Sequence, residues 1–578
     1  MYLKHINSCK LALVIENVFL LDSLLTSLLN IYCTFVRLSI ENKITLIYFL
    51  LSDFIMCGIW AIFGMDNCHR GTYFKCFFCI VHRGPDAWRI EQDSREPLTV
   101  LGFQRLAIVD GLYGMQPMRL HQFPRITLIC NGEIYNCKRL RDQFDFPYET
   151  NCDVEAIIHC YKKFGIVEAV KMLDGVFAFC LVDGEARKIY IARDPYGVRP
   201  LFKLQDDENC AIAICSEAKA LIELKQKTSP TSTLGQFPPG HCEEWDMLEG
   251  GKVKCSFTKQ YYTPGMSPSF QPFVSETELA QCSNVYQKTA YLLEAACKKR
   301  LMSDRRIGCL LSGGLDSSLI TALVVKLAKS INLPYKIQTF AIGMGDSPDL
   351  IAARTVAEYL GTEHHEVKFD ENDVRQELDN VIYHLESFDI TTIRASLPMY
   401  LLSKYIKENT DTTVVFSGEG ADELAQGYIY FRDAPDAKAA HEESIRLLSD
   451  IYLYDGLRAD RTTSAFSLEL RVIEPALRQP QNGVEKHLLR TSFAGSGLLP
   501  DSILFRHKEA FSDGVASVKK SLFTTINEII QERLQEVPDS YPGVKPTTTE
   551  SKYYRYIFEK SFAGHKIDFS TFTLACRK

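Results

Sequence analysis

The sequence predicts a mixed α/β chain of at least two domains, the first made of layered sheets covered by helices and the second of a parallel α/β sheet. Three observations predict this fold class. The chain has 578 residues, which is longer than a single hydrophobic core usually serves. From Cys57 to about residue 262, apolar residues occur in short runs separated by turns. From about residue 277 the order becomes strand, loop and long helix, which is typical of a parallel sheet.

The composition is that of an ordinary globular protein, with 46% hydrophobic and 24% charged residues. The formal net charge of -7 gives no general field that attracts phosphate backbones, so we expect no nucleic-acid partner. The densest basic cluster is short, and we interpret it as a solvated helix end that leads into a strand: Lys298, Lys299, Arg300, Arg305 and Arg306.

The 19 cysteines are scattered through apolar segments, so we expect free thiols and no disulfide framework. The CxxC of Cys76 and Cys79 has no second cysteine or histidine pair at zinc spacing, so we expect no structural zinc. Free thiols without a secretory signal indicate a reducing compartment, and we expect the cytosol.

Residues 1–55 differ from the rest of the chain, because charged residues interrupt every apolar run. The longest uncharged stretch, Ser23 to Val36, has 14 residues, whereas a membrane span needs about 20. No small-residue cleavage site is evident, so we expect neither a membrane span nor a signal peptide. An interfacial anchor is the weaker alternative. We expect this segment to be absent from the mature protein, which would begin after Met56.

In the first half we expect six strands, two helices and a hairpin turn at Asp183 and Gly184. Beyond the strand that starts at Cys57, the expected strands are Thr99–Val109, Arg125–Cys130, Val176–Val182, Lys188–Arg193 and Cys210–Cys215. The expected helices are Val154–Phe164 and Ser216–Leu224. The stretch from Gly250 to Glu276 is rich in Pro, Ser and Thr and predicts a linker between the domains.

Cys57 is a candidate nucleophile because it directly follows a methionine. If Met56 is removed, Cys57 carries a thiol and a free α-amine, whose ordinary pKa of about 7.7 to 8.0 suits a general base. One residue would then supply both nucleophile and base. Inside a longer chain its nitrogen is an amide, so this mechanism and a retained extension exclude each other. The alternative interpretation is a buried structural cysteine.

Other residues of the first half fit the chemistry of amide hydrolysis. Asn131 and Gly132, in the run NGEIYN after a strand, can form an oxyanion hole. Arg105 offers a bidentate partner for a substrate carboxylate, while Asp153 and Glu133 can hold a substrate ammonium. Taken singly, each of these residues also fits an ordinary polar surface.

The second half contains a candidate phosphate loop, the run SGGLDSS from Ser312 to Ser318. It lies between the expected strand Ile307–Leu311 and the expected helix Leu319–Lys329. Its two glycines allow backbone amides to approach an anion, and its serines offer hydroxyl donors. Asp316 would repel that anion unless a cation bridged them, so we assign it to Mg²⁺. The Walker lysine is absent, which argues against a kinase-like cradle, and a glycine turn with a helix cap is the alternative.

Further strands are expected at Lys336–Gly343 and Thr412–Phe416, and the second ends in the run SGEGADE. That run places acidic groups at the carboxyl edge of the same sheet, with Asp422 opposite Asp316 to hold metal and pyrophosphate. Lys508, in KEAFSDG, can neutralise charge that develops on a phosphate or a tetrahedral intermediate. His364 and His365 precede an expected short strand, where a structural role is favoured over metal ligation.

These motifs in this order make the chain similar to the glutamine-hydrolysing asparagine synthetases: MCGIWAIFG, HRGPD, RLAIVD, NGEIYN, RDPYGVRPL, LLSGGLDSS, TFAIGM, SGEGADE and KEAFSDG. The resemblance covers about residues 56–560. It implies an αββα N-terminal-nucleophile glutaminase over residues 57–262, followed by a parallel α/β ATP-pyrophosphatase domain over residues 277–565. It also implies the substrates glutamine, aspartate and ATP, with Mg²⁺ and an internal passage for ammonia. A homodimer is compatible with it.

The resemblance also implies a role for each candidate residue. Cys57 would attack the glutamine amide, Asn131 and Gly132 would stabilise the oxyanion, and Glu419 and Lys508 would position β-aspartyl-AMP. Glutamine would be bound by Arg105, Leu106, Ala107, Ile108, Val109, Asn131, Gly132, Glu133 and Asp153. ATP would be bound by Leu310, Ser312, Gly313, Gly314, Leu315, Asp316, Ser317, Ile342, Ser417 and Gly418, and the metal by Asp316 and Asp422.

The chain departs from the family pattern at four places. The segment after Val472 is shorter, the tail after about Phe562 is unrelated, Val154 replaces a smaller residue, and residues 1–55 are additional. A noncatalytic or ammonia-only homologue is therefore the alternative function. A sugar-phosphate or phosphoribosyl amidotransferase is disfavoured by SGGLDSS, because those acceptors need no adenylation.

Overall fold

The computed structural model describes residues 57–66, 68–93, 95–96, 98–266, 269–270, 272–454, 475–481, 483–507, 514–516, 520–534 and 546–562. Lys508, residues 1–56, the stretch Glu469–Val472 and the tail after Phe562 lie outside these residues. Within the described parts of the chain, no helix combines the length and the apolar character needed to cross a bilayer.

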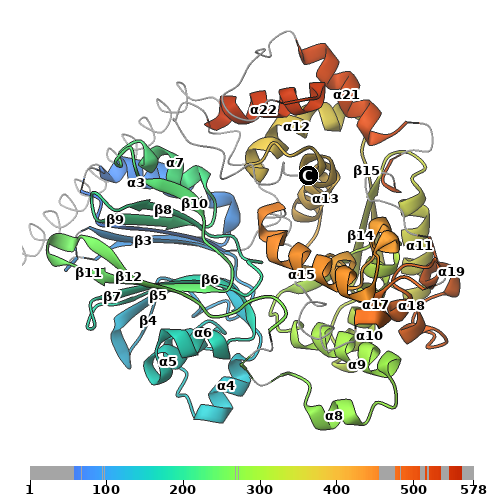
Figure 1. The fold of residues 1–578 in the computed structure, drawn as a ribbon, viewed down its shortest axis with the longest axis horizontal. Helices are drawn as coiled ribbons and strands as arrows, with labels where there is room; N and C mark the ends of the chain where they lie inside the picture. Colours follow the sequence, from blue (N-terminus) through green and yellow to red (C-terminus); the bar gives the residue numbers. More distant parts are fainter. Residues whose placement is uncertain are drawn as a thin grey trace, which may run out of the picture. The chain divides into compact units, whose positions relative to one another are not determined.

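The first half contains two six-stranded antiparallel sheets (Figure 1). The strand order of the first sheet is β10-β8-β9-β1-β3-β2. Its strands are β1 (Gly58–Phe63), β2 (Ala87–Gln92), β3 (Thr99–Arg105), β8 (Phe202–Asp206), β9 (Ala211–Cys215) and β10 (Thr233–Gln236). The strand order of the second sheet is β12-β11-β7-β6-β5-β4. Its strands are β4 (Met118–Leu120), β5 (Phe123–Ile134), β6 (Gly175–Asp183), β7 (Lys188–Arg193), β11 (His241–Met247) and β12 (Val253–Gln260).

Alternating side chains on β1 show how these sheets pack. Ile59 and Ala61 face a core shared with Ile129 and Ala178 of the second sheet. Trp60, one residue out of phase, belongs to the core beneath the outer helices. The outer helices are α3 (Arg70–Phe78) and α7 (Lys219–Lys225) on the first sheet, and α4 (Cys137–Phe144), α5 (Glu155–Phe164) and α6 (Ile166–Met172) on the second. The expected αββα sandwich is confirmed.

The second half is built on a parallel four-stranded sheet in the order β15-β14-β13-β16, which confirms the expected α/β architecture. The strands are β13 (Arg306–Leu310), β14 (Gln338–Gly343), β15 (Glu363–Lys368) and β16 (Thr412–Phe416). Its helices are α8 (Glu276–Ala280), α9 (Val285–Lys299), α10 (Leu315–Ser330), α11 (Pro348–Leu360), α12 (Glu371–Leu385), α13 (Ile390–Asn409), α14 (Ala421–Leu424), α15 (Ala437–Tyr454), α17 (Pro475–Arg478), α18 (His487–Phe493), α19 (Asp501–Leu504), α21 (Leu522–Arg533) and α22 (Thr549–Phe562).

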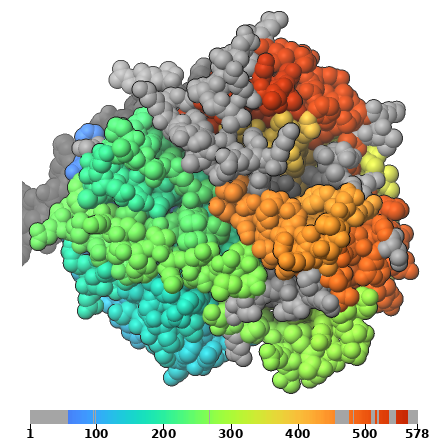
Figure 2. All heavy atoms as spheres, viewed as in Figure 1, coloured from blue at the N-terminus to red at the C-terminus, as the bar shows by residue number. Residues whose placement is uncertain are grey.

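Helix α15 joins the two halves on the face drawn in Figure 2. The ring of Tyr452 lies 5.5 Å from the Arg193 guanidinium, measured to the ring centroid. Arg193 is fully buried and donates hydrogen bonds to the Arg199, Gly197 and Phe237 carbonyls. The second half therefore contacts a buried and fully hydrogen-bonded side chain of the first.

Several element boundaries differ from the expected ones. The stretch from Gly250 to Glu276 is not a linker throughout, because β12 pairs with β11 inside it. Its outward side chains are mostly polar, as on an exposed edge strand, and they concealed the strand pattern. The expected strand Thr99–Val109 ends at Arg105, and α10 begins at Leu315, so Asp316 and Ser317 lie in its first turn.

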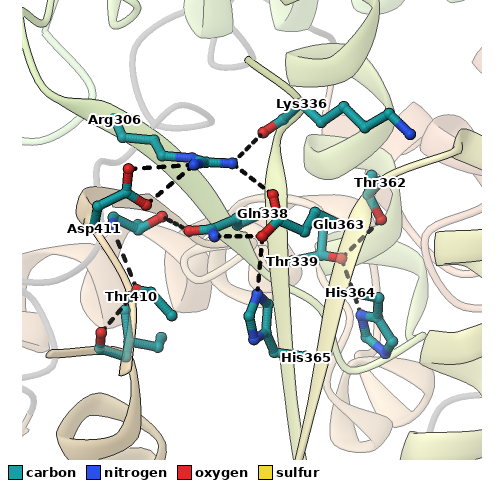
Figure 3. Close-up of polar contacts among 12 residues, drawn as sticks. Arg306, Lys336, Gln338, Thr339, Thr362, Glu363, His364, His365, Thr410 and Asp411 are labelled. Carbon is teal, nitrogen blue, oxygen red and sulfur yellow. Dashed lines mark hydrogen bonds and ion pairs between the residues drawn. The ribbon is translucent and has the colours of Figure 1, made fainter. Parts of the chain in front are cut away.

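The amino edge of the parallel sheet is tied together by polar side chains (Figure 3). Arg306 pairs with Asp411 and with Glu363, at 3.1 and 2.6 Å. His364 and His365 lie inside β15 rather than before it. His364 Nδ1 is 2.9 Å from the Thr339 hydroxyl, and His365 Nδ1 is 3.3 Å from the Tyr405 hydroxyl. These contacts support the structural role that the sequence favoured for both histidines.

Candidate active sites

Cys57 stands immediately before β1, and its thiol lies against the backbone of Leu106. The sulfur accepts a hydrogen bond from the Leu106 N–H and donates one to the Leu106 carbonyl, both at 3.4 Å. Burial raises the pKa of the Cys57 thiol to about 11, although the Leu106 N–H and Arg105 act in the opposite direction. At neutral pH roughly one thiol in ten thousand is ionised at that pKa, so attack requires a nearby base.

The loop 106–110 leaves β3 and faces Cys57, which explains why the strand is shorter than expected. Ala107 N–H donates to Asp86 Oδ2 at 2.7 Å. Arg105 donates to the Asp110 carbonyl at 2.5 Å and to the Gly111 carbonyl at 2.9 Å, so its guanidinium holds its own loop in shape. The structure thus brings the loop, Arg105 and Cys57 together.

Asn131 is the most distinctive polar group of the first site. It lies within β5 and is fully buried, so NGEIYN begins inside the strand rather than after it. Neither its Oδ1 nor its Nδ2 has a hydrogen-bond partner among the described residues. An unpaired buried amide usually costs free energy, which favours a substrate as its partner. At Gly132, an added Cβ would lie 2.4 Å from the Val176 carbonyl oxygen, so only glycine fits.

Asp153 and Glu133, the two expected ligands of a substrate ammonium, lie near one another. Asp153 Oδ2 accepts a hydrogen bond from the Ile134 N–H at 2.6 Å. Burial raises the pKa of Asp153 to about 7, with the nearby Glu133 carboxylate contributing in the same direction. A bound ammonium would stabilise both carboxylates. Arg199, which sequence reasoning missed, is buried and lies 3.8 Å from Glu133 Oε2.

A buried charge cluster lies behind Cys57. Arg83 donates from Nε to the Cys57 carbonyl at 3.2 Å and from NH1 to Glu217 Oε1 at 2.9 Å. Glu217 also pairs with Lys219 at 2.5 Å and with His82 at 2.8 Å. Burial alone would raise the pKa of the Glu217 carboxyl, but its neighbours His82, Lys219 and Arg83 hold that pKa well below its usual range. Glu386, from the second half, accepts the Lys219 N–H at 2.6 Å.

This cluster was not found from the sequence, because it joins three segments that lie more than 130 residues apart. Only the runs HRGPD and SEAK, each joining a cation and an anion in an apolar context, hint at it. Its position suggests that it orients the backbone of Cys57.

The second candidate site is at the carboxyl end of β13. Ser312 and Ser317 hydroxyls are 3.0 Å apart, and the Ser312 hydroxyl accepts the Gly314 N–H at 3.3 Å. Gly313 has a φ of +72°, and a Cβ there would lie 2.5 Å from the α11 backbone at Ala353. The loop is therefore a tight turn whose amides and hydroxyls lead into a helix N-terminus, as anion sites require.

The SGEGADE run lies directly against this turn. A Cβ on Gly418 would be 2.6 Å from the backbone nitrogen of Ser317, so the two loops touch. Asp422 lies opposite Asp316, as expected, and the Lys486 ammonium pairs with both carboxylates. Its distance to Asp422 Oδ1 is 2.6 Å. Sequence reasoning missed Lys486, which is buried and 170 residues from Asp316.

Of the other residues expected to bind ATP or the acyl adenylate, some lie at the carboxyl edge of the sheet and Glu419 is exposed to solvent. Leu310 is the last residue of β13, Ile342 is the last but one of β14, and Ser417 is buried immediately after β16. Glu419 is exposed, with its N–H donating to the Ser417 hydroxyl at 3.3 Å. Two carboxylates facing one another at a phosphate turn are the oxygen ligands that Mg²⁺ takes together with substrate phosphates, so Asp316 and Asp422 fit that ion.

Comparisons with known proteins agree on both halves. A family model described as a glutamine amidotransferase domain matches residues 56–237, and one described as asparagine synthase matches residues 288–439 and 432–567. Over 532 residues, the chain is 49% identical to a protein of Cricetulus griseus named asparagine synthetase (glutamine-hydrolyzing). Proteins of the same name from Rattus norvegicus and Gallus gallus are 49% and 50% identical. Each match covers 88% of this chain and 94% of the relative.

Proposed function

The chain belongs to the glutamine-hydrolysing asparagine synthetases, and from this premise we propose that it makes asparagine from aspartate, glutamine and ATP. Glutamine is hydrolysed to glutamate and ammonia in the first half. ATP and aspartate form β-aspartyl-AMP and diphosphate in the second half, where ammonia displaces AMP. The enzyme is an ATP-dependent carbon-nitrogen ligase.

Buried Asn131 is the observation that carries the glutaminase assignment. Its amide has no partner among the described residues, and it lies with Gly132 at the end of β5. The Cys57 sulfur attacks the amide carbon of glutamine, and the negative charge moves to the carbonyl oxygen. Asn131 Nδ2 and the Gly132 N–H donate to that oxygen. Ammonia leaves, and water then hydrolyses the thioester to release glutamate.

The proton of the Cys57 thiol needs an acceptor. We assign this role to the α-amine of Cys57, which exists only when nothing precedes that residue. The match of the amidotransferase family model begins at residue 56, which supports an active chain that starts at Cys57. On this proposal the working enzyme lacks residues 1–55 and the Met56 that follows them, and it consists of a glutaminase over 57–262 and a synthetase over 277–565.

In the synthetase half, the amides and hydroxyls of Ser312–Ser317 bind the diphosphate part of ATP, and Leu310, Ile342, Ser417 and Gly418 contact the nucleotide. Asp316 and Asp422 would hold Mg²⁺, whose charge offsets that of the leaving diphosphate. Aspartate's side-chain carboxylate attacks the α-phosphorus. Glu419 and Lys508 position the resulting acyl adenylate. The free thiols of the described cysteines support a reducing compartment such as the cytosol.

The test is product formation by purified protein that starts at Cys57. With aspartate, glutamine and Mg-ATP, we expect asparagine, glutamate, AMP and diphosphate in equal amounts. Cys57→Ala should abolish asparagine formation from glutamine and preserve formation from ammonium chloride. ADP in place of AMP, or no asparagine from either nitrogen source, would refute the proposal.

A further inference from the structure

Asp304 of the second half forms two hydrogen bonds with the loop 106–110 of the first half. Its N–H donates to the Ile108 carbonyl at 2.9 Å, and its Oδ2 accepts from the Asp110 N–H at 2.8 Å. On its other side the same loop carries Leu106, which contacts the Cys57 sulfur. A residue of the synthetase half thus holds the loop that faces the glutaminase nucleophile.

The connection that carries Asp304 is itself fixed to the first half at both ends. Before it, at the end of α9, Lys299 Nζ pairs with both oxygens of Asp174, at 3.0 and 2.9 Å. Both of these side chains are almost fully buried. After it, Arg305 lies 3.7 Å from Asp86 Oδ2, the atom that accepts the Ala107 N–H. Arg300 is also buried, so Lys299 and Arg300 are not a solvated helix end, contrary to expectation.

Asp110, which receives this support, has an unfavourable backbone conformation. Its φ of +51° is in the left-handed region, which non-glycine residues adopt at a cost of about 1 kcal/mol or more. Its carboxylate accepts the Tyr113 N–H at 3.0 Å and the Asn151 N–H at 2.9 Å. Asn151 lies two residues before Asp153. Through these hydrogen bonds Asp110 connects the loop 106–110 with the turn that carries Asp153.

We propose that Asp304 is a positioning residue for glutamine hydrolysis. By holding the Asp110 N–H and the Ile108 carbonyl, it keeps the loop 106–110 in the conformation that binds glutamine. The glutaminase site is therefore completed by the synthetase half. This inference rests on the proposed glutaminase function, but the hold of Asp304 on the loop can be measured without any turnover.

The kinetic test compares Asp304→Ala with Asp304→Asn in protein that starts at Cys57. Alanine removes the acceptor for the Asp110 N–H, whereas asparagine keeps a side-chain oxygen there. We expect alanine to raise KM for glutamine about tenfold, with a smaller change in kcat, and asparagine to restore most of the affinity. Ser303→Ala is the matched control, because among the described residues the Ser303 hydroxyl hydrogen-bonds only to the backbone of Arg305 in the same connection. Asparagine formation from ammonia should be unchanged in all three variants.

Amide hydrogen exchange of residues 106–113 gives the second readout. We expect faster exchange in Asp304→Ala and unchanged exchange in Asp304→Asn and Ser303→Ala. An unaltered KM in the alanine variant, or a parallel loss of ammonia-dependent synthesis, would overturn the proposal. If the unsubstituted protein hydrolyses no glutamine, the proposed function has failed. In that case amide hydrogen exchange alone tests whether Asp304 holds the loop 106–110. Unaltered exchange in Asp304→Ala would refute that hold.

Discussion

Arg83 donates a hydrogen bond from Nε to the carbonyl oxygen of Cys57, at 3.2 Å. The same guanidinium pairs with buried Glu217, which also binds Lys219 and His82. Glu386 of the second half then holds the backbone of Lys219. A continuous set of buried polar side chains therefore links the second half to the peptide that follows the nucleophile.

Replacing Arg83 should impair glutamine hydrolysis more than asparagine synthesis from ammonia. Arg83→Met frees the Cys57 carbonyl, and a displacement of about 1 Å at a nucleophile can reduce kcat roughly a hundredfold. It also leaves Glu217 with one cation fewer, at a cost of about 3 kcal/mol in unfolding free energy. Steady-state kinetics with glutamine and with ammonia, and denaturant unfolding, check both effects.

Two further variants separate catalysis from stability in that experiment. Arg95→Met is the control, because Arg95 pairs with Asp93 at the surface and should matter little. Adding Glu217→Gln to Arg83→Met should recover part of the stability, since the buried carboxylate is gone. Full glutaminase activity in a folded Arg83→Met protein would contradict the orienting role of Arg83.

Asn131 should affect kcat rather than KM for glutamine. Asn131→Ala removes an oxyanion donor, which typically lowers kcat by about 10² to 10³. Stability should not fall much, because neither polar atom of the side chain has a partner among the described residues. Glutamine kinetics and thermal unfolding measure the two quantities. A large loss of stability with little change in kcat would assign Asn131 to the core instead.

Lys486 should stabilise the folded protein by neutralising the carboxylates of Asp316 and Asp422 when no metal ion is bound. Lys486→Met leaves Asp316 and Asp422 facing each other without it, so we expect a lower midpoint of thermal unfolding in metal-free buffer. Added Mg²⁺ should raise that midpoint more in the variant than in the unsubstituted protein. Exposed Lys438, which pairs with Glu442 at the surface, provides the control Lys438→Met. An equal Mg²⁺ effect in all three proteins would argue against Mg²⁺ binding at these carboxylates.

Asp153 should make stability depend on pH. Its pKa is about 7 in the folded chain and 3.8 ordinarily, so between these values the folded state binds more protons than the unfolded state. The free energy of unfolding contributed by Asp153 therefore falls as pH rises through this window. Asp153→Asn cannot titrate. Its stability relative to the unsubstituted protein should rise from about pH 4 to about pH 7 and then level off, as unfolding at a series of pH values would show. A difference that is independent of pH would contradict the raised pKa.

The motifs predicted the fold well because each one places a glycine or a charged residue directly beside a recognisable strand or helix. SGGLDSS follows a strand, and its Gly313 indeed has positive φ and packs against α11. The short apolar runs of β6 and β7, which are buried along almost their whole length, also predicted the strand positions within one or two residues. The αββα packing follows from alternation within β1, which separates Ile59 from Trp60.

The errors have a common physical cause, which is that tertiary partners decide burial. Lys299 resembles an exposed lysine at a helix end, yet Asp174 lies 125 residues away and pairs with it inside the protein. Lys486 and Arg199 were missed for the same reason, since a single cation in a sequence carries no sign of its distant carboxylate. Strand β12 was mistaken for a linker because an edge strand needs few apolar residues.

The central claim is that Cys57 acts through its own α-amine, and one pair of proteins tests it most directly. The first protein begins at Cys57 and the second carries a single uncleaved glycine before it, with both N-termini verified by mass spectrometry. We expect the first to release glutamate from glutamine and the second to release none, while both form asparagine from ammonia at equal rates. Equal glutamine hydrolysis by the two proteins would contradict the mechanism.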